Sequence, residues 1–438
     1  VGYRMSGYFH ERLSTGTHDP LLAKALVLAQ GDVAAAIVCC DVVGISLEVS
    51  QAARKMAAEQ TGIPAEQILI AATHSHTGPL YFGALRQEFK RRTVAEHGSD
   101  VHETVDYSSW LAERLAEAIA DAHTNRQTIE LAAGVGRQTG LSFNRRFHMR
   151  DGSVRCNPGK LNPDIVRVAG PIDPDVGLLA FRPAGGGEPL AVFSVFSLHL
   201  DTVGGTEYAG DYPFYVQELL HERLGESVTS FFAAGTCGDI NHVDVSHDRP
   251  QKGHAEAQRI GTALGETVLA TLPELTAVAE PELAIAGTTV ALPLQQYDED
   301  EISQARLDIE RVDSRELSSE ERVRAYKIMA LELRGGDTLD AEVQVVRLSH
   351  DVALVALPGE VFVDLGLAIK RASPFRTTLV MELTNDAPGY VPTLRGFAEG
   401  SYETINSRIA PGGGERLVEE AVKLLDRLHA PIGEAAGD

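Results

Sequence analysis

The sequence predicts an α/β protein in which helices flank one large domain of mixed sheets. Apolar, strand-like runs alternate with amphipathic, helix-like segments along all 438 residues. No internal repeat and no low-complexity linker separates one part of the chain from another. We therefore expect a single domain over residues 1–438.

The elements follow from hydrophobic periodicity and from the Gly and Pro residues at their ends. Residues 47–61 predict a helix that Gly62 and Pro64 terminate. Residues 176–182 and 190–198 predict a β-hairpin. A second hairpin is expected at 343–348 and 352–357, further strands at 23–41 (one or two), 67–72, 129–137, 229–234, 281–292 and 377–383, and further helices at 102–123, 212–224, 254–272 and 414–429.

Residues 297–334 differ from the rest of the chain because they are strongly charged. The segment has helical periodicity and begins with four consecutive acids, Asp298 to Glu301. It is a candidate helical insertion into the domain. The alternative is a solvated helical face of the domain itself, which is the more common explanation of such a charge run.

Composition limits the classes of partner. The net charge of -23 argues against a nucleic-acid-binding protein, because phosphate recognition requires a basic surface. No apolar run approaches the roughly 20 residues of a membrane-spanning helix, so we expect no integral membrane association and a small-molecule substrate. The chain starts at Val1 without Met, which indicates a trimmed N-terminus and leaves open a cytoplasmic or secreted location. The oligomeric state is not predicted.

Five predicted strands run into polar residues with Gly or Pro close by. Ligands of open α/β sheets gather just past strand ends, where rigid strands hold converging loops. These strand ends lie at residues 73–79, 196–202, 235–242, 357–360 and 381–390. We expect the functional site where they meet.

Three of these strand ends carry a set of side chains suited to a metal. Zinc favours imidazole nitrogen and carboxylate oxygen, and His74, His199 and Glu360 supply both. Their spacing is too wide to form a local motif. The alternative for any single histidine at a strand end is a hydrogen-bonded structural role, which is more common.

The same residues resemble a known family, the neutral/alkaline non-lysosomal ceramidases. The stretch Thr73-His74-Ser75-His76-Thr77-Gly78-Pro79 resembles that family's THTHSGP motif. Four further elements follow in the family's order: Phe196-Ser197-Leu198-His199, Cys237-Gly238-Asp239, Leu357-Pro358-Gly359-Glu360, and Tyr390-Val391-Pro392-Thr393 with Tyr402-Glu403. The resemblance implies the fold of the family's catalytic domain.

The resemblance also implies roles for individual residues. It implies a catalytic Zn²⁺ held by His74, His199, Glu360 and Tyr390. His76 and Tyr402 would face the substrate, with His76 kept off the metal as the proton donor to the leaving group. Asn144-Arg145 is similar to the family's Asn-Arg pair, which would place an arginine in the pocket.

The sequence departs from the family at one residue of the expected site. Asn241 stands where the family has a serine, and a carboxamide can donate a hydrogen bond but cannot act as a serine-type nucleophile. Within these 438 residues we expect no counterpart of the family's carboxy-terminal immunoglobulin-like domain.

The expected substrate differs from ceramide. Aromatic residues make up only 6% of the chain, and the loops around the expected site are polar. We therefore expect a zinc-dependent hydrolase that cleaves an amide or ester bond of a polar substrate with a metal-activated water, with Asn241 positioning the substrate. Two alternatives stay open: a metal-containing protein that binds a small ligand without hydrolysis, and a metal-dependent enzyme that cleaves glycosides.

Overall fold

Three mixed β-sheets form the centre of the protein. The computed structural model describes residues 1–312, 314 and 316–430. The first sheet has the order β2 (Ala23–Gln30), β3 (Val33–Cys40), β4 (Ile68–Ala72). The second has the order β13 (Thr229–Ala234), β11 (Ala191–Phe196), β10 (Asp175–Pro183), β5 (Ile129–Arg137), β15 (Thr276–Ala277). The third has the order β16 (Pro281–Pro293), β17 (Thr338–Ser349), β18 (Val352–Ala356), β20 (Thr377–Met381).

Each sheet contains one parallel strand pair that is joined through a helix. The pairs are β3 with β4, β11 with β13, and β18 with β20. The connecting helices are α1 (Leu47–Thr61), α4 (Tyr212–Leu224) and α8 (Val363–Ala372). The three sheets are therefore built on three βαβ units, and the carboxyl ends of each pair lie at one edge of its sheet.

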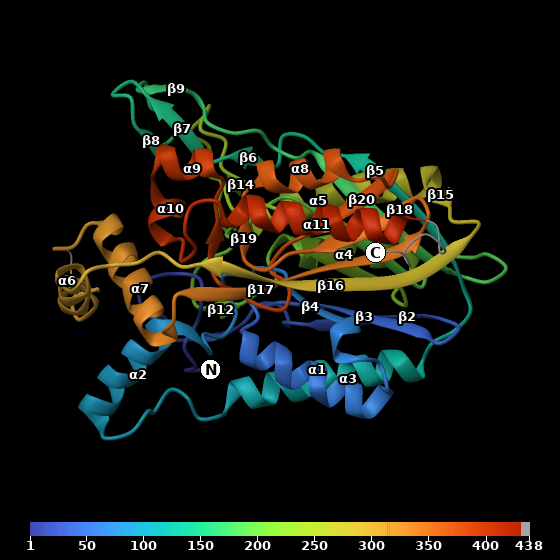
Figure 1. The fold of residues 1–438 in the computed structure, drawn as a ribbon, viewed down its shortest axis with the longest axis horizontal. Helices are drawn as coiled ribbons and strands as arrows, with labels where there is room; N and C mark the ends of the chain where they lie inside the picture. The colour runs from blue at the N-terminus through green and yellow to red at the C-terminus, as the bar shows by residue number, and fades with distance from the viewer. Residues whose placement is uncertain (313, 315, 431–438) are drawn as a thin grey trace, which may run out of the picture.

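Helices cover the outer face of each sheet, and the inner faces share one core (Figure 1). The first sheet packs against α1 and α3 (Tyr107–Thr124), the second against α4 and α5 (His254–Thr271), and the third against α8 and α11 (Gly413–His429). Between the sheets, Leu69, Phe193 and Leu354 belong to a single apolar cluster. The sheets are thus held as one body.

A short segment after β20 joins all three sheets at their carboxyl ends. Ala72 of β4 donates to the Leu383 carbonyl at 3.1 Å, and Glu382 donates through its backbone N–H to the Ala234 carbonyl at 2.9 Å. Leu383 and Asn385 both have positive φ, at 55° and 63°, a conformation that costs energy for side chains other than Gly. We call residues 382–385 the seam, because they tie the ends of β4, β13 and β20 together.

The charged segment 297–334 contains two helices at one end of the molecule (Figure 1). Asp298 caps the N-terminus of helix α6 (Glu299–Ile309), and Ser318 caps that of helix α7 (Ser319–Arg334). Both caps are part of a capping box. Helix α7 packs against α2 (Gly83–His97) and α10 (Tyr402–Asn406). This places the segment beside the carboxyl ends of the sheets.

The other short elements complete the chain. They are β1 (Gly16–Thr17), β6 (Phe143–Asn144), β7 (Arg146–Met149), β8 (Val154–Cys156), β9 (Ile165–Val168), β12 (Glu207–Tyr208), β14 (Ile240–Asn241), β19 (Glu360–Val361), β21 (Tyr390–Val391), α9 (Leu394–Glu399), η1 (Ala65–Gln67) and η2 (Leu272–Glu274). No helix of the described residues is both long and apolar enough to span a membrane.

The predicted fold class is confirmed, and most predicted elements lie within a few residues of those observed. Helix α3 starts at Tyr107 and not at 102, because the Asp106 side chain accepts a hydrogen bond from the Ser109 N–H and caps it. Helix α2 was not predicted. Charged residues such as Glu88, which pairs with Arg91 and Arg92, interrupt its apolar periodicity.

The close packing of α4 on α5 predicts a stability effect. A Cβ added at Gly261 would clash with the Tyr212 carbonyl oxygen and lie 2.6 Å from the Tyr215 Cβ. Gly261→Ala should therefore lower the free energy of unfolding by about 1–3 kcal/mol, measured by urea denaturation. Gly287→Ala is the control, since its added Cβ would come no closer than 3.3 Å to any atom outside its neighbours. Equal effects of the two substitutions would contradict the packing argument.

Candidate metal centre

Three imidazoles converge on one point at the carboxyl ends of β4 and β11. The Nε2 atoms of His74 and His199 are 3.0 Å apart, those of His76 and His199 3.1 Å, and those of His74 and His76 3.3 Å. A carboxylate oxygen of Glu360 lies 3.5 Å from the His74 Nε2. Among the described residues, these histidines form one of two groups of side chains close enough to share a metal ion.

The Nε2 triangle fits a bound metal. Ligand nitrogens about 2.0–2.1 Å from a tetrahedral zinc are about 3.3–3.4 Å from each other, slightly more than the separations seen here. Nδ1 of His74 lies 2.6 Å from the Val43 carbonyl oxygen and must donate to it, because a carbonyl can only accept. Nε2 of His74 then carries the lone pair that a metal requires.

The backbone around His74 holds its ring in place. His74 has φ of 79°, which is uncommon outside Gly and costs energy. Its N–H donates to the Val42 carbonyl at 3.1 Å, and the N–H of Thr73 donates to the Cys40 carbonyl at 2.9 Å. These two bonds hold the backbone after β4 against the residues that end and follow β3.

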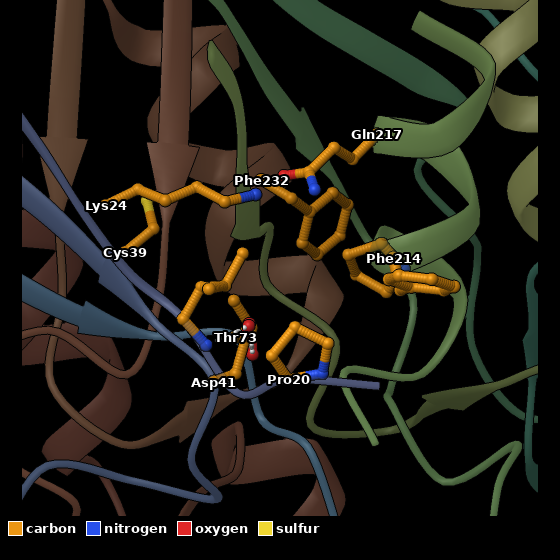
Figure 2. A pocket seen from close by; sticks show the side chains of 10 residues that line it. Pro20, Lys24, Cys39, Asp41, Thr73, Phe214, Gln217 and Phe232 are labelled. Atoms are coloured by element: carbon orange, nitrogen blue, oxygen red, sulfur yellow. Dashed lines mark hydrogen bonds between the residues drawn. The ribbon is translucent and has the colours of Figure 1, made fainter. Parts of the chain in front are cut away.

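A small pocket of about 20 Å³ lies beside Thr73 (Figure 2). Asp41 accepts a hydrogen bond from the Thr73 hydroxyl at 3.1 Å and from the Leu22 N–H at 2.9 Å. Lys24 reaches the pocket from the other side and donates to the Ser230 carbonyl at 2.7 Å. The pocket is large enough for one water, and the bond from Thr73 to Asp41 helps to hold the residue that precedes His74.

The N-terminal loop closes over His76. A Cβ at Gly7 would lie 2.6 Å from the His76 Cβ, so this close approach requires Gly. Arg12 donates to the His76 carbonyl at 2.7 Å. The Asp201 carboxylate accepts from the Tyr8 hydroxyl at 2.5 Å and lies 3.7 Å from the His76 Nδ1, on the side of the ring away from the cluster.

The buried Glu382 carboxyl holds the loop that carries Glu360. It accepts hydrogen bonds from the Val361 N–H at 2.6 Å and from the Cys237 N–H at 3.1 Å. Burial raises its pKa well above the usual value, and its side chain is fully buried. Gly238 contacts the Glu360 carbonyl so closely that a Cβ there would clash. Glu382 therefore joins the loops after β13 and β18 next to the histidines.

Tyr390 and Tyr402 line the same cavity as His74 and His76, and Arg145 packs behind the two tyrosine rings. Tyr390 pairs with Glu360 in the parallel β19–β21 ladder. The two tyrosine rings are 5.5 Å apart at 71°, and the Arg145 guanidinium lies 5.5 Å from the Tyr390 ring centre and 5.8 Å from that of Tyr402. Arg145 is held by Glu403, whose carboxylate is 2.8 Å from its Nε.

Two other predicted residues are bonded to protein groups. The Asn144 Nδ2 donates to Asp239 at 2.7 Å. The Asn241 Nδ2 donates to the Asn157 Oδ1 at 2.8 Å, and its Oδ1 accepts from the Val243 N–H at 3.0 Å. Asn241 lies in the short β6–β14 ladder opposite Phe143, so both asparagines belong to one loop pair.

Burial governs the charges at the centre. It lowers the pKa of His76 to about 4 and that of His199 well below the usual value, so these two rings are uncharged at neutral pH. Burial also raises the pKa of Tyr390 and Tyr402, so both hydroxyls stay protonated. For Glu360 burial raises the pKa, but His74, Tyr390 and Arg145 together outweigh it and the net pKa is lowered.

A cavity of about 140 Å³ opens onto this centre. Five of the residues singled out in the sequence line it, namely His74, His76, Glu360, Tyr390 and Tyr402. Residues that the sequence did not single out line the rest, among them Phe9, Leu80, Phe82, Tyr326 and Arg408. They come from segments with no motif, so only the folded chain identifies them.

The second group of possible metal ligands consists of His18, Asp19 and His254. Nδ1 of His18 is 2.8 Å from an Asp19 oxygen, and the two histidine rings stack with centres 3.6 Å apart at 15°. Lone pairs of stacked imidazoles lie in parallel planes and do not converge on a common point. This group therefore suits a stacked pair beside a carboxylate better than a shared ion.

Two solved structures resemble this protein over nearly its whole length. No family model and no curated protein matches the chain. The solved structure of neutral ceramidase from Pseudomonas aeruginosa matches it with a TM-score of 0.72 and 18% identity, over 100% of this chain and 74% of that one. A ceramidase complexed with C2 matches with a TM-score of 0.69 and 17% identity, over 99% and 74%. Identities this low show the fold alone: the chain has the neutral ceramidase fold, as its motifs predicted.

Proposed function

We propose that this protein is a metal-dependent hydrolase of amide or ester bonds. The observation that carries the proposal is the triangle of Nε2 atoms from His74, His76 and His199, each within 3.3 Å of the other two. A bound Zn²⁺, the ion that suits imidazole and carboxylate ligands, would supply a Lewis acid that activates a water near neutral pH.

The proposed donor set is the three imidazoles together with Glu360. It differs from the set that the family resemblance implies, in which Tyr390 is a ligand and His76 stays off the metal. The position of His76 supports the change, since its Nε2 is as close to that of His199 as a shared ion requires. Tyr390 interacts instead with the Glu360 carboxylate and helps to keep it ionised.

Tyr390 and Tyr402, which line the cavity, provide donors for the charge that develops during hydrolysis. When a carbonyl is attacked, its oxygen gains negative charge and needs donors already in place. The protonated hydroxyls of Tyr390 and Tyr402 can donate to this oxygen. The Arg145 cation lies against both rings and adds favourable charge beside them.

We further propose that the substrate is polar. Polar side chains that line the cavity, among them Asn406 and Arg408, offer hydrogen bonds to a substrate. The apolar residues of the cavity would hold the rest of the molecule.

Metal removal should test the reaction class. Purified protein should contain Zn²⁺ by metal analysis, and a panel of polar amides and esters should include at least one that it hydrolyses. A chelator should abolish this activity and added Zn²⁺ should restore it. A protein that takes up no metal on titration would contradict the proposal. A zinc-loaded protein that turns over no member of the panel would favour the ligand-binding alternative.

Substitution of His76 can distinguish a metal ligand from a proton donor at this position. His76→Ala, like His74→Ala, should lower the zinc content and abolish turnover, because a donor is lost from the cluster. Zinc per chain and kcat would be measured for each variant. His97→Ala is the matched control, since His97 lies at the exposed end of α2. Full zinc content with a lost kcat in His76→Ala would show instead that His76 stays off the metal.

Asn241 should affect turnover without affecting the metal. Asn241→Ala removes the carboxamide that bonds Asn157 and Val243 beside the site. We expect kcat/KM to fall about 10- to 100-fold, as for the loss of one or two buried hydrogen bonds, with unchanged zinc content. Loss of zinc in this variant would contradict a purely substrate-positioning role.

A further inference from the structure

We propose, on the basis of the function above, that Arg408 binds a carboxylate of the substrate. The enzyme would then act on amides or esters in which an apolar segment ends in a carboxylate. Arg408 lines both the cavity of about 140 Å³ at the histidines and a wider cavity of about 690 Å³ next to it. It therefore stands where a substrate that reaches the histidines passes outward.

The position of Arg408 is fixed by its neighbours. Its Nη1 donates to the Pro388 carbonyl at 2.5 Å and its Nη2 to the Tyr326 hydroxyl at 3.1 Å. A Cβ at Gly389 would lie 2.8 Å from Nη1, so the guanidinium rests on the backbone just before Tyr390. The guanidinium is therefore held against Gly389, the residue that precedes Tyr390 in the chain.

Its charge has no counter-ion among the described carboxylates. No acidic group that the structure describes lies within ion-pair distance of Arg408, although the chain carries 62 acids against 39 Lys and Arg. Asp386 is the nearby acid, but its carboxylate accepts from the Ala387 N–H at 2.8 Å. Burial raises the pKa of Asp386. The Ala387 N–H, Arg334 and Arg408 lower this pKa, but they do not outweigh the effect of burial. A cation kept unpaired in so acidic a protein is available for an anionic ligand.

The other cations near Arg408 do not take this role. Lys327 is buried, and its ammonium group donates to the Tyr297 hydroxyl and the Gln295 side chain. Burial lowers the pKa of Lys327 to about 7, and Arg408 adds to this. Arg334 is exposed, and it lines the wider cavity but not the cavity at the histidines.

The surroundings favour a carboxylate at the end of an apolar segment. Phe9, Leu80 and Phe82 line the cavity that the histidines share with Arg408, and the Phe9 ring packs on Tyr326 with centres 5.4 Å apart. An apolar wall lowers the local dielectric and strengthens the pairing of opposite charges. The planar guanidinium matches the two oxygens of a carboxylate, and the Tyr326 hydroxyl beside it can donate as well.

The test compares probes that differ only at the far end. N-phenyladipamic acid carries a terminal carboxylate, its carboxamide analogue is neutral and polar, and N-phenylhexanamide is neutral and apolar. Binding of each to the zinc-loaded protein would be measured by calorimetry, and release of aniline would report turnover separately. The variants are Arg408→Gln, Arg408→Lys and, as the control, Arg334→Gln.

We expect the wild type to bind the carboxylate probe about 10- to 100-fold more tightly than the carboxamide probe. Arg408→Gln should remove this preference, Arg408→Lys should keep part of it, and Arg334→Gln should keep all of it. Equal binding of the two probes by the wild type would overturn the proposal even if Arg408→Gln does not fold. A preference that survives in Arg408→Gln, or that is lost in Arg334→Gln, would overturn it too.

The binding and turnover results are independent. A carboxylate preference that depends on Arg408 supports this inference even if no aniline is released, in which case the hydrolase proposal fails for these anilides. Turnover without a carboxylate preference supports the hydrolase and overturns the role of Arg408.

Discussion

The seam at residues 382–385 is the structural constraint on which the site depends. Its backbone bonds to the ends of β4 and β13, and the Glu382 carboxyl binds the backbone of Cys237 and Val361. Three βαβ units from distant parts of the chain thereby bring their carboxyl ends to one point. The seam is strained at Leu383 and Asn385, and this strain is offset by the bonds between the sheets.

The sequence predicted most of the long strands and helices, but it missed helix α8, which packs its apolar face on the third sheet, and helix α2. Strands such as β11 follow from their apolar run, and helices such as α1 follow from their periodicity and the Gly and Pro residues at their ends. Helix α2 was missed because its buried positions include Glu88, which is neutralised by arginines that only the folded chain brings near. The grouping of strands into three sheets also required the structure, because pairing between distant strands leaves no local signal.

The candidate site was only partly visible in the sequence. Polar residues after apolar strands pointed to His74, His199 and Glu360, and the order of the motifs added Tyr390, Tyr402 and Arg145. The approach of His76 to the other imidazoles, 3.1 and 3.3 Å between Nε2 atoms, depends on the φ of His74 and on Gly7, which no spacing rule predicts. Arg408 and Tyr326 were missed because they carry no motif and gain their meaning only from the cavity they line.

The coordination of the metal is the most direct test of this account. X-ray absorption spectroscopy at the zinc edge, on protein loaded with an equivalent of Zn²⁺, reports the number and type of ligands and their distances. The account predicts three imidazole nitrogens at about 2.0–2.1 Å together with oxygen ligands. A spectrum with two imidazoles would contradict the assignment of His76 to the metal, and one without histidine ligands would contradict the site as a whole.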